Sequence, residues 1–441
     1  MEVLVKILQL LLSLSILVIF HEFGHFITAK MFKTRVEKFY LFFNPWFALF
    51  KFKKGETEYG MGWLPLGGYV KISGMIDESM DKEAMKLPPK PYEFRSKPAY
   101  QRLIIMLGGV TVNILLAIAI YVVMLAYWGE EYLPTSEANK YGIVCDSMAI
   151  EMGLRDGDKF LSVDNEPVED FLKIPITIIL NEAQSVQVER DGEKLDIQIP
   201  EGFIGKFIKQ KSANFLFVRY PYIAAGFAKN SIGEEAGIKV DDHIIGINGE
   251  YLPYFDQFAK RLSDFKNQDI SVIVLRDMDT LNLNMTLSET AKIGVYVKPV
   301  SEFFTFSEKK YNLISAIPAG INKAYVGIGD YLKQLKLLFS PEVKAYESVG
   351  GFITIGSIFP ATWDWENFWR LTAFLSIMLA ILNVLPIPAL DGGHVMFLLY
   401  EIIARRKPSD KFMEYAQVVG MVILFALLIF ANGNDIVKLF R

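Results

Sequence analysis

The sequence predicts a polytopic α-helical membrane protein with four transmembrane helices and a large water-exposed insertion between the second and the third. Apolar residues make up 52% of the chain, and its mean hydropathy is +0.27. Four stretches remain apolar over a length that can cross a bilayer. Two of these stretches contain ionisable residues at a depth where charge is costly, which indicates a function beyond anchoring.

The apolar stretches define the membrane part of the chain. We expect transmembrane segments at residues 1–30, 101–128, 367–400 and 411–433. The first segment begins with Glu2 and Lys6 and has no small-x-small cleavage site, so we interpret it as a retained helix and not as a cleaved signal peptide.

The charges of the connecting segments predict the orientation. Basic residues outnumber acidic ones in residues 30–102 and again in residues 405–411, whereas acidic residues dominate residues 130–366. Because basic loops remain in the cytoplasm, we expect the insertion and both termini on the outer side. A lipid bilayer is the expected surrounding, and no nucleic acid is expected as a partner.

Residues 21–25, at the end of the first apolar stretch, form an H-E-x-x-H motif. Its two histidines share one helix face, as two zinc ligands require, and Glu22 lies roughly 100° away, where it can take a proton from an attacking water. The alternative is a helix end whose polar residues reach the headgroups. Against it, each ionisable group there costs ~2.5 kcal/mol or more if charged and unpaired. The single cysteine, Cys145, leaves zinc binding to histidine and carboxylate.

Residues 383–394 contain prolines, glycines and a carboxylate within an apolar segment. Pro386 and Pro388 remove backbone donors, so the helix must break here, and a broken backbone at membrane depth requires an adjoining cavity. Asp391 is therefore the candidate third zinc ligand. N-capping of the following helix is the alternative role, and it does not exclude ligation. For His394 we favour a structural role.

Residues 58–75 contain five glycines between short apolar stretches. This pattern is typical of a β-hairpin and not of a helix. We therefore expect a β-hairpin loop within the region 31–100, resting on the membrane surface or re-entering it.

The insertion contains an internal repeat, because residues 153–165 align with residues 237–249. Both stretches resemble the PDZ-domain fingerprint G-[LI]-x-x-G-D-x-I-x-x-[VI]-[ND]-G. Two α+β PDZ-like domains are expected, at 135–210 and 215–300. Such domains bind an extended peptide at a sheet edge, for which residues 140–144 and 223–227 are the candidate strands, or they act only as a size filter.

Residues 308–366 connect the insertion to the third apolar stretch. Apolar and aromatic residues alternate there with lysines, and Trp363 and Trp365 precede the membrane segment. We expect interfacial helices on the outer leaflet. Packing against the PDZ-like domains is the alternative.

Together, the motifs resemble the site-2 protease group of intramembrane zinc metalloproteases, and within it the bacterial regulator of sigma-E proteases. The resemblance covers nearly the whole chain and includes H-E-F-G-H, L-P-L-G-G-Y-V-K at 64–71 and N-x-x-P-x-P-x-L-D-G-G at 383–393. Two departures occur. Residues 108–114 lack the proline and the aromatic of A-G-P-x-x-N-F but retain Asn113, and Phe352 stands where proline is common.

The resemblance implies a role for each motif. His21, His25 and Asp391 would bind Zn²⁺, and Glu22 would be the general base. Residues near the substrate would be Asn383, Pro386 and Pro388, together with a re-entrant β-loop that includes Gly67, Gly68, Tyr69 and Val70.

The resemblance also implies a biological setting. The protein would lie in a bacterial inner membrane, with the PDZ-like domains and both termini in the periplasm and the active site near the cytoplasmic side. It would cut a pre-cleaved anti-sigma factor and signal-peptide remnants in an envelope stress response. The rival hypotheses are a membrane-anchored PDZ scaffold with an inactive metal site and, with less support, a transporter.

Overall fold

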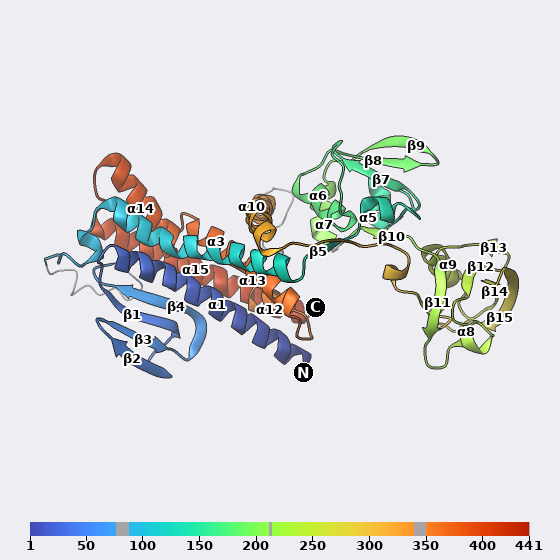
Figure 1. The fold of residues 1–441 in the computed structure, drawn as a ribbon, viewed down its shortest axis with the longest axis horizontal. Coiled ribbons are helices and arrows are strands. Elements are labelled where there is room, and N and C mark those ends of the chain that lie inside the picture. The colour runs from blue at the N-terminus through green and yellow to red at the C-terminus, as the bar shows by residue number, and fades with distance from the viewer. Residues whose placement is uncertain (76–87, 211–213, 339–349, 441) are drawn as a thin grey trace. The chain divides into compact units, whose positions relative to one another are not determined.

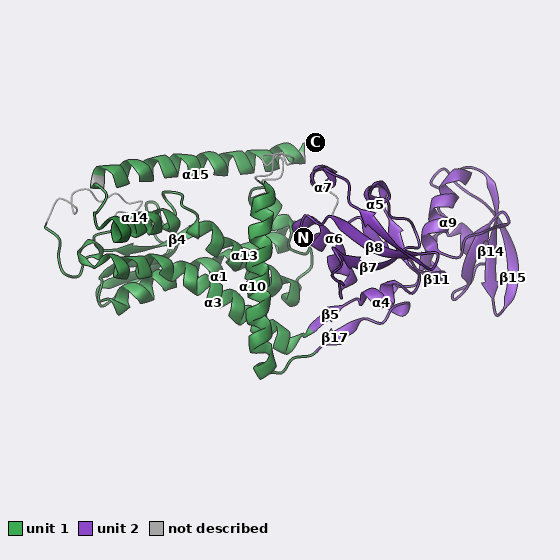
Figure 2. Cartoon of the chain, turned by 90° about the horizontal axis from the view of Figure 1, so that it is seen from above, with its two compact units in different colours: residues 1–129, 310–339, 344–441 green, residues 130–309, 340–343 purple. Residues whose placement is uncertain are grey.

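The computed structural model describes residues 1–75, 88–210, 214–338 and 350–440 (Figure 1). The chain divides into two compact units, which Figure 2 colours separately. Unit 1 contains residues 1–129, 310–339 and 344–441, and unit 2 contains residues 130–309 and 340–343. Long helices dominate unit 1, whereas unit 2 combines strands with short helices.

Four helices of unit 1 are long and apolar enough to cross a membrane, as the sequence predicts. They are α1 (Glu2–Met31), α3 (Ala99–Tyr127), α13 (Trp365–Val384) and α15 (Asp410–Leu439). The central helix is α3, which packs against α1, α13, α10 (Leu313–Leu338) and α14 (Asp391–Ala404). The short helices η1 (Phe94–Ser96) and α12 (Phe352–Ser357) complete the described helices of this unit.

The contact between α1 and α3 depends on glycine. A side chain on Gly24 would collide with the backbone of Gly108, and one on Gly108 would collide with Gly24. Small residues let two helix backbones approach closely, which is how helices pack in a solvent as apolar as lipid. This close contact brings α3 directly behind the H-E-x-x-H motif.

The third apolar stretch is broken, as its prolines predict. Helix α13 ends at Val384 and α14 begins at Asp391, and Ala389 between them has a φ of 83°. A non-glycine residue in this region is uncommon and costs conformational energy. The expected segment 367–400 is therefore two helices joined by a tight, proline-containing loop.

The two described helices of the connector before α13, α10 and α12, belong to unit 1. Helix α10 packs against α3 and α13, while residues 339–349 lie outside the described part of the chain. In α12, the backbone N–H of Phe352 donates to Asn432 Oδ1 of α15 at 3.2 Å. The proline common at this position could not make that bond.

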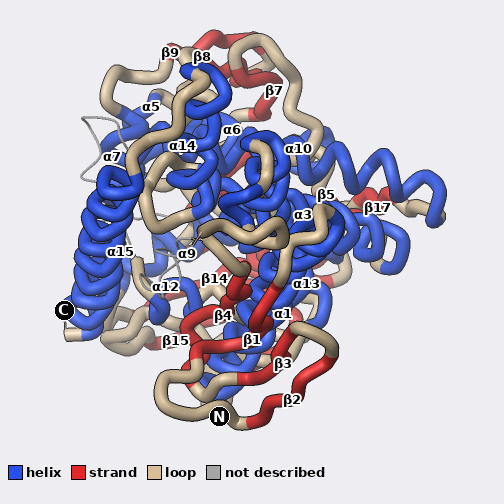
Figure 3. Tube along the Cα trace, turned by 90° about the vertical axis from the view of Figure 1, so that its left-hand side faces the viewer, coloured by secondary structure: helices blue, strands red, loops and turns tan. Residues whose placement is uncertain are grey.

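A four-stranded sheet lies beside α1 (Figure 3). Its order is β2-β3-β1-β4, with β1 (Val36–Phe43), β2 (Phe50–Lys54), β3 (Thr57–Met61) and β4 (Leu64–Ile72). The expected hairpin over residues 58–75 is wrong, because β3 and β4 pair on opposite sides of β1. The chain passes the end of β1 at Gly62, where a side chain would collide with the backbone of Phe43. Within this four-stranded sheet, only β2 and β3 form a hairpin.

In unit 2 the internal repeat takes the same local structure twice. A short helix, α5 (Ser147–Met152) or α8 (Ile232–Glu235), is followed by a glycine with a φ of 103° or 102°, Gly153 or Gly237. Such left-handed backbone favours glycine. A strand follows in each copy, β7 (Lys159–Val163) or β12 (His243–Ile247).

Matching ion pairs extend the repeat beyond the backbone. Asp158 accepts from Arg190 at 2.8 Å, and Asp242 accepts from Arg276 at 2.7 Å. Each arginine also donates to the carbonyl of the left-handed glycine of its own copy. Each copy therefore contains a buried carboxylate, Asp158 or Asp242, that holds the turn before the strand in place.

The strands of unit 2 form two similar sets. In the first copy β7 pairs with β8 (Ser185–Arg190) and β8 with β9 (Glu193–Gln198), while β6 (Ile143–Cys145) pairs with β10 (Leu216–Val218). The second copy has the order β15-β14-β12-β11-β16, with β11 (Tyr222–Phe227), β13 (Glu250–Tyr251, on β12), β14 (Asp269–Arg276), β15 (Asp279–Thr286) and β16 (Val295–Val297). The other described elements are β5 (Glu130–Tyr132), α4 (Thr135–Ala138), η2 (Phe171–Lys173), α6 (Ile174–Leu180), α7 (Phe203–Gln210), α9 (Phe255–Leu262), η3 (Ser263–Phe265), η4 (Val300–Glu302) and β17 (Ser307–Lys309).

This pairing corrects the candidate groove strands. Residues 223–227 lie in β11, which pairs with β12 on one side and with β16 on the other. Residues 140–144 overlap β6, which pairs with β10 and also exchanges backbone hydrogen bonds with residues 157 and 158. Residues 223–227 are therefore internal to their sheet, whose outer strands are β15 and β16, and β6 is flanked by β10 and by residues 157 and 158. The two repeated stretches take the same local structure, but the strands that pair with them are distant in sequence.

The single cysteine offers a test of packing in unit 2. Cys145 is buried in β6, and burial, with nearby Asp156 and Asp158, raises the pKa of its thiol to about 12. Because the thiolate is the reactive form, we expect a maleimide to leave the native protein unlabelled and to label it after denaturation. Cys145→Ser should stay unlabelled throughout. Rapid labelling of the native protein would contradict the burial of Cys145.

Candidate metal centre

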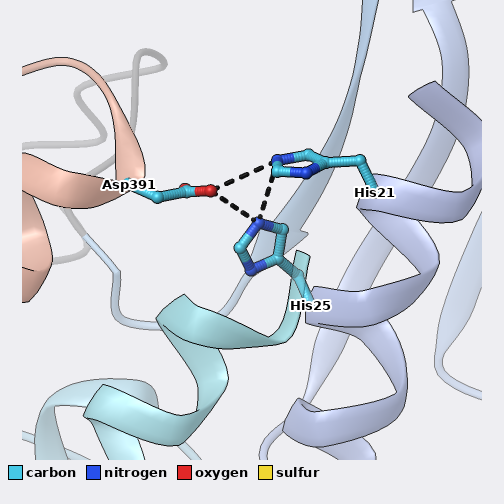
Figure 4. A group of neighbouring side chains, drawn as sticks. All are labelled: His21, His25 and Asp391. Carbon is cyan, nitrogen blue, oxygen red and sulfur yellow. Dashed lines mark hydrogen bonds and ion pairs between the residues drawn. The ribbon is translucent and has the colours of Figure 1, made fainter. Parts of the chain in front are cut away.

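Three side chains from two helices converge at one point in unit 1 (Figure 4). His21 and His25 lie one turn apart on α1, and Asp391 is the first residue of α14. The Nε2 atoms of the histidines are 3.3 Å apart, and Asp391 Oδ2 lies 3.2 Å from each of them. Of the described residues, no other group of three metal-binding side chains is this close together.

The spacing of these atoms fits a tetrahedral ion. Ligands held about 2.0–2.1 Å from a zinc ion in tetrahedral geometry lie about 3.3 Å from one another. The three separations therefore correspond to one face of a tetrahedron. Two imidazoles and a carboxylate are a donor set that zinc prefers, and the fourth position stays open for a reacting group.

Glycine makes room for the two histidines. A side chain on Gly109 of α3 would lie 2.5 Å from His25 Nε2 and 2.6 Å from His21 Cε1. Because real Cβ atoms do not approach so closely, any larger residue at 109 must displace the rings. Together with the Gly24–Gly108 contact, Gly109 places α3 against the histidines without filling the site.

A substitution at Gly109 tests this geometry. We expect Gly109→Ala to weaken zinc binding by at least about tenfold, because it moves the ligand atoms themselves. Gly433→Ala on α15 is the matched control, since a side chain there meets nothing within 4 Å. Zinc dissociation constants from chelator competition measure both. Equal affinities for the two variants would contradict the crowding at Gly109.

The loop before Asp391 is held tightly. A side chain on Gly392 would collide with the carbonyl of Leu385, and one on Gly420 of α15 would collide with the carbonyl of Pro388. The helix α14 is capped by Leu390 without a side-chain bond, so Asp391 is the first helical residue and not the N-cap. Its carboxylate is directed at the histidines instead.

A cavity of about 420 Å³ contains the metal-binding group and Glu22. Its other lining residues are Lys38, Phe43, Gly68, Tyr69, Val70, Lys71, Ile72, Met75, Met106, Ala389, Leu390, His394 and Gln417. Strand β4 supplies the largest share of its wall. A side chain on Gly68 would lie 3.5 Å from Glu22 Cγ, which shows how closely β4 passes the acid.

The structure brings together most of the residues expected at the site. His21, Glu22, His25, Asp391, Gly68, Tyr69 and Val70 line the cavity, whereas Gly67, Pro386 and Pro388 do not. Asn383 is adjacent, with its amide nitrogen 3.3 Å from His21 Nε2. The prolines shape the loop rather than the cavity wall.

Three lining residues of the cavity, two on β1 and one on α15, were not anticipated. Lys38 and Phe43 come from β1, a strand whose mixed sequence resembles the surrounding loop. Gln417 is buried on α15, although it interrupts an apolar stretch. A polar residue inside a membrane segment is a signal that could have identified it.

Comparison with known proteins agrees with this centre. The model of Peptidase family M50 matches residues 9–427. A Rickettsia conorii protein named "Putative zinc metalloprotease RC0203" is 28% identical over 99% of both chains. The "Regulator of sigma E protease" of Haemophilus influenzae is 26% identical over 97% of this chain and 98% of its own. The similarity thus extends over both units.

Proposed function

The chain belongs to peptidase family M50, the site-2 protease family, and we propose that it hydrolyses peptide bonds within transmembrane segments of single-span membrane proteins. The family expected from the sequence motifs is thereby confirmed, as are its class, zinc metalloprotease, and its cofactor, Zn²⁺. The observation that carries the proposal is the tetrahedral spacing of three ligand atoms among apolar helices.

In this proposal each residue of the centre has one role. His21, His25 and Asp391 hold the zinc, which supplies a Lewis acid that polarises the scissile carbonyl and lowers the pKa of water to ~7. Glu22 takes a proton from the attacking water and gives it to the leaving amine as the C–N bond breaks. Its place on the wall of the same cavity supports this assignment.

Strand β4 is the proposed site of substrate presentation. A helical segment hides its peptide bonds, so it must be extended before hydrolysis, and strand addition satisfies the freed backbone groups. In the described sheet β4 is an outer strand, and Gly68, Tyr69 and Val70 line the cavity beside Glu22. Gly67 continues this strand. We propose that Asn383, whose amide nitrogen lies 3.3 Å from His21 Nε2, also lies near the substrate, together with Pro386 and Pro388 of the loop before Asp391.

The proposed orientation places the β-sheet and the metal centre toward the cytoplasmic face of a bacterial inner membrane. Loop charge supports this orientation, with both termini and unit 2 in the periplasm. We interpret the two copies in unit 2 as tandem PDZ-like domains with β10 and β16 as candidate peptide-binding edges. They would capture or exclude a substrate according to the part of it that remains outside the membrane after trimming.

The proposed substrate is an anti-sigma factor already trimmed outside the membrane, together with signal-peptide remnants. The motif resemblance and the name of the Haemophilus influenzae relative support this choice. Cleavage would release a cytoplasmic fragment into an envelope stress response.

The test is cleavage of a purified single-span protein by the full chain in detergent. We expect one zinc per chain, loss of cleavage when zinc is removed by a chelator, and recovery when zinc is returned. Cleavage should fall within the transmembrane segment, as mass spectrometry of the fragments can show. A protein that binds the substrate and zinc but never cuts it would favour the rival hypothesis, a PDZ scaffold with an inactive metal site.

A further inference from the structure

The two histidines of the metal centre differ in what faces their second ring nitrogen. A neutral imidazole that binds a metal through Nε2 has its proton on Nδ1, and that N–H needs an acceptor. For His25 the acceptor is the backbone carbonyl oxygen of Ile105, which lies 2.9 Å from its Nδ1. For His21 the facing group is the side-chain amide of Asn113, 3.2 Å from Nδ1.

Asn113 is held firmly in this place. It is fully buried on α3, and Ser376 Oγ of α13 donates to its backbone carbonyl at 2.8 Å. Gly109 lies one turn earlier on the same helix, and a side chain there would lie 2.8 Å from the same His21 Nδ1. The buried Oδ1 of Asn113 has no hydrogen-bond partner among the described residues.

The proton on His21 decides which end of the amide must face the ring. With the amide NH₂ toward Nδ1, the ring nitrogen must act as acceptor, and its proton would then occupy Nε2, the atom aimed at Asp391 and His25. A half-turn of the amide about its Cβ–Cγ bond exchanges the two ends and offers Oδ1 to an Nδ1–H. Only this orientation leaves Nε2 unprotonated, as ligation requires.

We propose that Asn113 is a positioning residue that accepts a hydrogen bond from His21 Nδ1–H and thereby directs Nε2 of that ring to the zinc. The inference rests on the zinc site proposed above. It gives the two ligands parallel supports on α3, a backbone carbonyl for His25 and a side-chain carbonyl for His21. Asn113 contacts neither the zinc nor the substrate in this role.

The experiment compares zinc dissociation constants of the full chain in detergent by chelator competition, without any need for cleavage. Asn113→Leu keeps the volume but removes the acceptor, and we expect it to bind zinc about 10- to 100-fold more weakly. Asn113→Asp keeps an acceptor of the same shape and should bind zinc at least as tightly as wild type. Thr372→Val is the matched control, because it removes another fully buried polar group of the helix bundle away from the centre.

The ordering of the variants separates positioning from packing. If Asn113 only fills space, Asn113→Leu should bind zinc as tightly as wild type, so weaker zinc binding by this variant refutes a packing role. Equal zinc affinity of Asn113→Leu and wild type would overturn the proposal. Equal weakening by Asp and Leu would overturn it too. If Asn113→Leu does not fold, Asn113→Ala replaces it and must show the same ordering. A wild type without zinc would instead refute the metal centre itself.

Discussion

Replacing Glu22 with glutamine should abolish peptide-bond hydrolysis and leave the zinc bound. Glutamine has nearly the same shape but cannot take up a proton, while His21, His25 and Asp391 remain unchanged. General acid–base groups typically contribute about 10²- to 10⁴-fold to rate, so we expect a loss of at least that size. The rate of cleavage under single-turnover conditions and the zinc content per chain are the two measurements.

A second glutamate on the same helix provides the control. Glu2→Gln makes the same chemical change in the first turn of α1, far along the helix from the motif, and should leave both measurements as in wild type. If Glu22→Gln cleaves normally, Glu22 is not the general base. If it loses zinc together with activity, Glu22 supports the metal rather than the proton transfer.

The metal-binding residues could be found from sequence because each carries a local signal. Residues four apart lie on the same face of any α-helix, and His21 and His25 lie within helix α1. Asp391 stood out because a carboxylate between glycines and prolines cannot belong to a lipid-facing helix. The break between α13 and α14 follows from the same prolines.

Other features depend on contacts between distant segments. Strand β1 lies between β3 and β4 and pairs with both of them. The predicted hairpin of β3 and β4 is therefore replaced by a four-stranded sheet. Asn113 is a retained polar residue in an apolar stretch, but the sequence does not indicate that Asn113 and Gly109 face His21. The candidate groove strand at residues 223–227 was misplaced for the same reason. It lies in β11, whose partner β16 comes at the far end of the second copy in sequence. Periodicity identifies elements, but their neighbours are decided by tertiary packing.

Replacing Asp391 with alanine should remove zinc from the protein and with it all hydrolysis. The substitution deletes one of three ligands, and the remaining two histidines form only one edge of the tetrahedron. We expect zinc affinity to fall by more than the ~10- to 100-fold that the loss of an outer hydrogen-bonding partner causes. Chelator competition and metal content measure the loss.

A helix-capping role is separated from ligation by a second aspartate. Asp364 caps α13 by accepting from the backbone N–H groups of residues 366 and 367, so Asp364→Ala should cost about 1 kcal/mol of stability but no zinc. Asp391 has no such capping bonds, since Leu390 is the N-cap of α14. Asp391→Ala should therefore lose zinc while its helices stay folded. Retention of wild-type zinc affinity by Asp391→Ala would show that the carboxylate is not a ligand, and the tetrahedral face would then lack its third corner.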